Sequence, residues 1–125
     1  MILTGLSVAL GGAIGATLRW LTGQLTLRVI GPGFPWGTVT VNIFGSFLMG
    51  VIVVVLAERG GTRMAPFLMT GLLGGFTTFS AFSLDAVALM ERGQFALMAA
   101  YVGGSVIIGL AALVLGMNVT RMVLA

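Results

Sequence analysis

The chain has 125 residues, of which 58% are hydrophobic and 7% are charged, and its mean hydropathy is +1.17. A soluble domain carries about 25% charged residues, so this chain lacks the charge to cover a water-facing surface, and an integral membrane protein is predicted. The absence of Cys and His excludes disulfides and thiolate or imidazole metal sites, and an enzyme is not expected. Six scattered arginines give the net charge of +3, which favours residues flanking membrane spans over a nucleic-acid surface.

Four spans are predicted in one transmembrane domain, residues 1–125, because about 20 residues per crossing nearly use up the length. The first span, 2–27, begins without a basic segment, which argues against a cleaved signal peptide. Near its far end stand Arg19 and Trp20. On sequence alone an interfacial arrangement is favoured, with Trp20 in the aromatic belt and Arg19 reaching the headgroups. The alternative is an arginine that lies under a pore mouth or holds a helix end.

The second span, 38–57, follows a cluster of Gly and Pro residues at 31–37 that predicts a turn. It contains Asn42, an amide inside an otherwise apolar run. A buried amide costs free energy unless it is paired. Two interpretations stay open: Asn42 bonds across to another helix, or it lines a polar path.

The third span, 64–90, is longer than one crossing needs and contains an unusual stretch, Gly71 to Ser83. This stretch holds three Gly, two Thr, two Ser and three Phe and no charge. Adjacent glycines followed by β-branched hydroxyl residues are poor helix material. Irregular backbone at membrane depth survives only where it is buried in protein or lines a cavity. We therefore predict a helix that is broken mid-membrane, with the functional site at the break.

Asp85, near the end of the third span, is the only acid within an apolar segment. A membrane-embedded acid is a candidate functional residue. Its place near the interface makes a solvated or arginine-paired carboxylate at least as good an interpretation.

The fourth span, 95–119, carries Tyr101 and Ser105. With four spans, the arginines divide three against three between the two sides: Arg59, Arg63 and Arg121 against Arg19, Arg28 and Arg92. The positive-inside rule then gives almost no orientation bias. A chain of this kind can insert both ways, and two oppositely inserted copies can form an antiparallel dimer.

A broken helix frees carbonyl oxygens that suit alkali cations and N–H groups that suit anions. Hydroxyl groups lie beside the predicted break, on Thr77, Thr78, Ser80 and Ser83. Phe79 and Phe82 are three residues apart and share a helix face. Ring edges turned into a narrow path favour an anion, and ring faces favour a cation. For each phenylalanine taken singly, plain packing is the simpler interpretation, and spacing alone does not choose the ion.

Three motifs in register resemble the Fluc (CrcB) fluoride channel family: Gly15 to Trp20, Gly37 to Asn42, and Gly74 to Ser83. With the order and length of the spans, the resemblance covers essentially the whole chain. It implies an all-α, antiparallel dual-topology homodimer in the bacterial cytoplasmic membrane. Such a dimer has two pores that conduct fluoride passively and selectively.

The resemblance also implies roles for individual residues. Backbone carbonyls of Gly74 and Thr77 would bind a central, structural Na⁺, with four oxygens from two copies. The implied fluoride pore consists of Arg19, Asn42, Phe79, Ser80, Phe82, Ser83 and Ser105. Three positions depart from the family pattern and put its outer polar track in doubt: Ala81 where Thr is common, Asp85 where Glu is usual, and Gly109 where some relatives have a hydroxyl.

Two other functions compete with a fluoride channel. A small multidrug-resistance exporter also has four short helices, but it relies on a glutamate in its first helix, and the first apolar segment here has no acid. A non-transporting assembly subunit would use its glycines and phenylalanines only for packing. That reading leaves the polar, helix-breaking run in the third span unexplained.

Overall fold

The computed structural model describes residues 1–125, and every element in it is helical. Three helices are continuous: α1 (Ile2–Val29), α2 (Trp36–Arg59) and α5 (Phe95–Leu124). The third span is divided into a 3₁₀ turn η1 (Thr62–Met64), a π-helix η2 (Pro66–Leu73), a short α3 (Gly74–Phe76) and α4 (Phe79–Glu91). All four spans are long and apolar enough to cross a membrane. The predicted all-α membrane fold with an interrupted third helix is confirmed.

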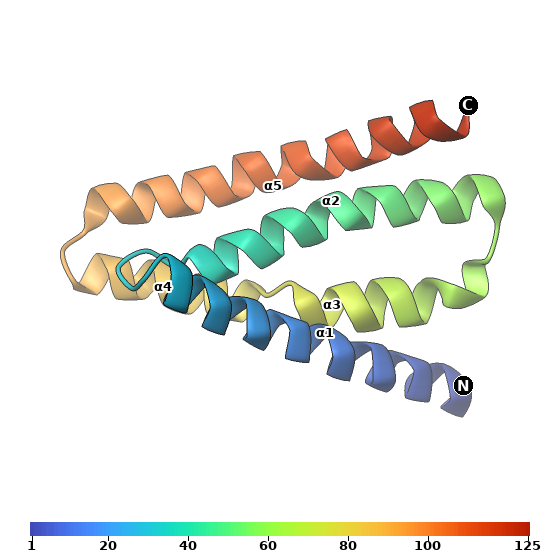
Figure 1. The fold of residues 1–125 in the computed structure, drawn as a ribbon, viewed down its shortest axis with the longest axis horizontal. Helices are drawn as coiled ribbons and strands as arrows, with labels where there is room; N and C mark the ends of the chain where they lie inside the picture. Colours follow the sequence, from blue (N-terminus) through green and yellow to red (C-terminus); the bar gives the residue numbers. More distant parts are fainter.

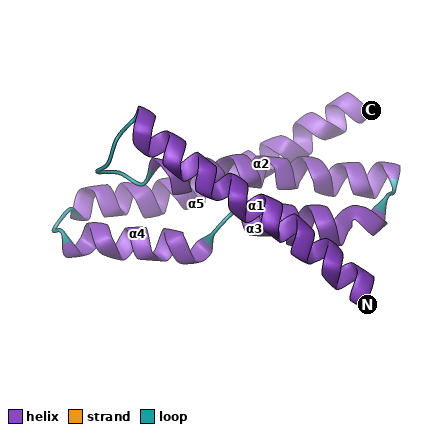
Figure 2. Cartoon of the chain, turned by 60° about the horizontal axis from the view of Figure 1, so that its bottom comes forward, coloured by secondary structure: helices purple, strands orange, loops and turns teal.

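The four spans run back and forth, so both termini lie at one end of the molecule with the loop that joins α2 to η1 (Figure 1). The α1–α2 loop and the turn between α4 and α5 lie at the opposite end. α2 and α5 run alongside each other, and α1 crosses obliquely over η2 and α3 (Figures 1 and 2). The break between α3 and α4 therefore lies midway along the bundle, held between α1 and α2.

Glycines allow α1 to approach the third span backbone to backbone. A Cβ atom on Gly11 would lie 2.5 Å from the carbonyl oxygen of Phe67, and one on Gly75 would lie 2.7 Å from that of Gly12. On the other side of the bundle, Gly50 of α2 and Gly116 of α5 make contacts of the same kind. Close backbone approach through small residues is the usual basis of helix packing in membranes.

The outer surface of the chain is apolar, and few side chains are buried. Val41, Leu73, Leu89 and Tyr101 form the centre of the small core. Large apolar side chains are exposed on every span, as expected for helices that face lipid or a second copy of the chain.

The break falls within the predicted stretch, Gly71 to Ser83, and it follows the two adjacent glycines. Gly74 and Gly75 are helical, and the chain turns extended at Thr77 and Thr78. The N–H of Thr77 still bonds to Leu73 O at 2.9 Å, whereas the N–H of Thr78 leaves the helix and bonds to a side chain on α2. The point of interruption is therefore set by a partner on another helix.

Candidate functional site

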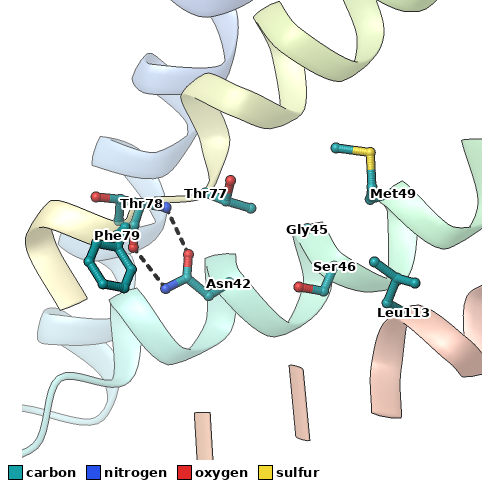
Figure 3. Close-up of a pocket in the computed structure, with 8 residues that line it drawn as sticks. All are labelled: Asn42, Gly45, Ser46, Met49, Thr77, Thr78, Phe79 and Leu113. Carbon is teal, nitrogen blue, oxygen red and sulfur yellow. Dashed lines mark hydrogen bonds between the residues drawn. The ribbon is translucent and has the colours of Figure 1, made fainter. Parts of the chain in front are cut away.

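Asn42 of α2 holds the break in the third span through two hydrogen bonds. The N–H of Thr78 donates to Asn42 Oδ1 at 2.8 Å, and Asn42 Nδ2 donates to Thr78 O at 3.0 Å (Figure 3). The amide thus satisfies the N–H and the C=O of Thr78, which the interruption has removed from the helical ladder. Both sequence interpretations of Asn42 meet here, because the side chain bonds across two helices and also borders a pocket.

Thr78 begins α4 as its N-cap. Its φ and ψ of −152° and 125° are extended, and its Oγ1 accepts a hydrogen bond from Ala81 N at 3.1 Å. The N–H groups of Phe79 and Ser80 have no partner in the chain. A helix N-terminus with free N–H groups carries partial positive charge, which favours an anion at this point.

On the other side of the break, backbone carbonyls have left the helical ladder. Those of Gly74 and Thr77 accept no hydrogen bond. That of Gly75 accepts one from Arg19 Nε at 3.0 Å. The interfacial arrangement favoured for Arg19 on sequence alone is therefore wrong, because its guanidinium turns inward and holds the end of α3.

The two predicted pore phenylalanines lie together at the start of α4. Their ring centroids are 5.8 Å apart, and the Phe82 ring in turn lies 5.2 Å from that of Tyr101. Phe79 is 79% exposed in the single chain, although it directly follows the break. The exposed Phe79 ring, midway along the bundle, is therefore free to contact a second chain or to border an ion path.

A pocket of about 280 Å³ opens directly at the break. It combines the Asn42 amide, the Thr77 and Thr78 backbone and the Phe79 ring with small or flexible residues of α2 and α5 (Figure 3). Its lining residues are Asn42, Gly45, Ser46, Met49, Thr77, Thr78, Phe79 and Leu113.

The predicted pore hydroxyls are not gathered at one place. Ser80 Oγ lies 3.3 Å from Thr78 Oγ1, and Ser83 Oγ donates back to Phe79 O at 3.0 Å, so both belong to the first turns of α4. Ser105 lies on α5, and its Oγ is buried without a hydrogen-bond partner. Such a hydroxyl is costly to bury unless it has another partner to bond.

Asp85 bonds to two hydroxyl groups and pairs with no arginine. Its Oδ2 accepts hydrogen bonds from Thr38 Oγ1 at 2.7 Å and from Tyr101 OH at 3.2 Å. The carboxylate thus joins α2, α4 and α5 beyond the break. Sequence reasoning missed Thr38 and Tyr101 as its partners, and only the presence of hydroxyl residues in otherwise apolar spans could have suggested them.

Comparison with known proteins gives a consistent result over nearly the whole chain. Residues 6–117 match the family model described as CrcB-like protein, Camphor Resistance (CrcB). The chain is 64% identical over 121 residues to the fluoride-specific ion channel FluC of Cereibacter sphaeroides (strain ATCC 17029 / ATH 2.4.9), covering 97% of each. It is 58% identical over 125 residues to that of Ruegeria sp. (strain TM1040), covering 99% of each. Identity to that of Agrobacterium fabrum is 52% over 116 residues, covering 91% of this chain and 93% of the relative.

Proposed function

The chain belongs to the CrcB-like family, and from that membership we propose that the break in its third span is the place where it conducts fluoride. The protein is a multi-pass protein of the bacterial inner membrane and a fluoride ion channel, not an enzyme. The observation that carries the proposed site is the pocket at the break, where the Asn42 amide, the start of α4 and the Phe79 ring meet.

The groups at this pocket suit a small anion that must lose water. The Asn42 NH₂ has two donors, and its bond to Thr78 O uses one of them. The free N–H groups at the start of α4 add positive potential, and aromatic ring edges are positive as well. None of these groups carries a full charge, so an anion is attracted without being trapped, as conduction requires. We expect the flow to be passive, because Asp85, the one acid away from the helix ends, is already bonded to two hydroxyls.

The working unit is an antiparallel homodimer. One chain leaves Phe79 exposed and its pocket open on one side, so a second copy is needed to close a path. Because Arg19 is bonded at the break, three arginines at one end of the bundle face two at the other, Arg28 and Arg92. This difference is too small to fix one orientation strongly. A two-fold axis in the membrane plane relates the two copies. An ion path beside the break of one copy is therefore repeated beside the break of the other, and the dimer has two pores.

The free carbonyls of Gly74 and Thr77 fit a structural Na⁺ shared by the two copies. Neither oxygen accepts a hydrogen bond, and carbonyl oxygen is a hard ligand that suits an alkali cation. Two copies would supply four such oxygens, and the bound ion would balance carbonyl dipoles that are otherwise unsatisfied. Replacing sodium with N-methylglucamine is expected to lower the melting temperature of the purified dimer. An unchanged melting temperature would count against the ion.

The experiment that tests the channel is fluoride efflux from proteoliposomes, read with a fluoride electrode, with chloride measured in parallel and valinomycin present to remove the membrane voltage. Fast fluoride loss without chloride loss is expected. Phe79→Ile and Phe82→Ile should each lower the fluoride rate by about tenfold or more and still form dimers, because both keep an apolar side chain but remove the ring edge. Phe95→Ile, an exposed ring at the start of α5, is the matched control and should conduct normally.

Two outcomes would contradict the proposal at different levels. A well-folded dimer without fluoride efflux would exclude conduction by this protein and favour a packing subunit. Normal efflux in both phenylalanine variants would exclude the ring-edge mechanism and leave the channel itself intact.

A further inference from the structure

Five aromatic rings form a continuous series from the α1–α2 loop to the break. Phe34 lies 4.7 Å from Trp36 and 5.6 Å from Tyr101, measured between ring centroids. Tyr101 lies 5.2 Å from Phe82, which lies 5.8 Å from Phe79. Phe34 contacts neither pore phenylalanine directly, so Tyr101 is the link between the loop and the pore.

The loop that carries Phe34 is held rigidly. Gly31 and Gly33 have φ values of +100° and +113°, which side-chain-bearing residues rarely adopt. Pro35 has φ −79° and ψ 68°, and Trp36 N donates to Phe34 O at 2.8 Å, which together define an inverse γ-turn. The backbone of Phe34 is thus fixed against the first residue of α2, which places its side chain beside Tyr101.

Tyr101 needs such a neighbour, because its hydrogen bond does not fix its ring plane. The hydroxyl donates to Asp85, but the oxygen lies on the axis about which the ring rotates, so the bond survives that rotation. Packing around this buried ring sets the plane instead, and two of its neighbours are aromatic. Phe34 meets Tyr101 edge to face at an interplanar angle of 89°, a favoured aromatic geometry. Phe82 meets the same ring at 40°.

We propose that Phe34 is a positioning residue for fluoride conduction, which fixes the plane of Tyr101 and through it the orientation of Phe82. This inference rests on the proposed pore role of Phe82. Phe34 lies outside the buried core and borders two open pockets of about 210 and 240 Å³, both shared with Asp85. Its ring thus packs against Tyr101 at the end of the bundle that carries the α1–α2 loop, and the core does not enclose it.

The test compares Phe34→Leu and Phe34→Met, which keep an apolar side chain without a ring, with Phe34→Tyr, which restores the ring. Fluoride efflux is expected to fall about tenfold in the first two and to stay within about twofold of wild type in the third. The melting temperature and the dimer fraction are measured on the same samples and should hardly change. Phe95→Leu is the matched control, because Phe95 is the exposed first residue of α5, and α5 begins at the same end of the bundle as the α1–α2 loop (Figure 1).

Four results would overturn the inference. Wild-type efflux from Phe34→Leu and Phe34→Met would show that the ring has no effect on conduction. Equal losses in all three Phe34 variants would show that the aromatic ring is not what matters. Melting temperatures that fall in step with efflux, or failure of both non-aromatic variants to fold, would assign Phe34 a purely structural role. If the wild-type dimer itself does not conduct fluoride, the proposed function fails, and Phe34 is not the cause.

Discussion

At the scale of single residues, Asn42 contributes most to stabilising the break, because its side chain replaces two hydrogen bonds that the broken helix has lost. The same amide borders the pocket in which Phe79 lies. In the proposed site, structure and conduction are therefore coupled at this position, and a substitution here is expected to change both. Arg19 stabilises the other side of the break through a single hydrogen bond, which its Nε donates to Gly75 O.

Asn42→Leu is expected to abolish most fluoride efflux and to lower the stability of the protein. The change leaves the N–H and the carbonyl of Thr78 without partners, which costs about 1–3 kcal/mol for each group. Efflux assays and thermal melts on the same preparation measure the two effects. Asn118→Leu is the control, because Asn118 is exposed on α5 and bonds only weakly, at 3.5 Å to Arg121. A conducting Asn42→Leu channel with an unchanged melting temperature would remove Asn42 from the site.

Asp85 shows where residue-level reasoning from sequence fails. An acid near the end of a span has two usual partners, water and arginine. The hydroxyls that bind it come from Thr38 and Tyr101, which lie 47 and 16 positions away in the chain. No spacing rule connects these three residues, so only the packing of α2, α4 and α5 brings them together.

At the scale of elements, the third span combines three kinds of helix and one break. Its composition predicts the interruption, because glycines and β-branched residues weaken a helix at mid-membrane. The position of the break does not follow from the glycines, because Gly74 and Gly75 remain helical and α1 packs tightly against Gly75. The break instead lies at Thr78, where the Asn42 side chain of α2 accepts a hydrogen bond from the Thr78 N–H. No pattern in the sequence predicts the π-helix η2 that precedes the break.

Gly75→Ala is expected to separate α1 from α3 and so to disturb the bond between Arg19 and Gly75 O. A Cβ atom at this position would lie 2.7 Å from Gly12 O and 3.0 Å from Gly12 Cα, and backbone cannot move aside as a flexible side chain can. Overpacking of this kind costs about 1–3 kcal/mol, measured as a lower melting temperature with reduced efflux. Gly5→Ala, on α1 with nothing within 4 Å of its Cβ, should be neutral or slightly stabilising. Equal behaviour of the two variants would contradict the proposed packing.

At the scale of the whole molecule, the central question is orientation. The inward turn of Arg19 changes the arginine count from three against three to three against two, a difference of only one residue. The exposed apolar faces and the open pocket at the break leave room for a second chain. An inverted partner fits both observations.

Single cysteines report the orientation directly, because the chain has none of its own. Thr62→Cys and Gln94→Cys place a thiol at opposite ends of the bundle on exposed residues (Figure 1). A membrane-impermeant maleimide applied to intact cells is expected to label about half of each variant, since a weak arginine bias inserts the chain both ways. Complete labelling of one variant and none of the other would show a single orientation and exclude the antiparallel dimer.

The sequence by itself determined the membrane environment, the four spans and the interruption of the third, because these depend on local composition and length. It also identified the residues that meet at the break, Asn42, Thr77, Thr78 and Phe79, since polar groups in apolar spans must find partners. The tertiary structure decided which partner each polar group takes: Thr78 for Asn42, Gly75 for Arg19, and two hydroxyls for Asp85. The physical reason is that such groups are satisfied across helices, at sequence separations where local patterns carry no information.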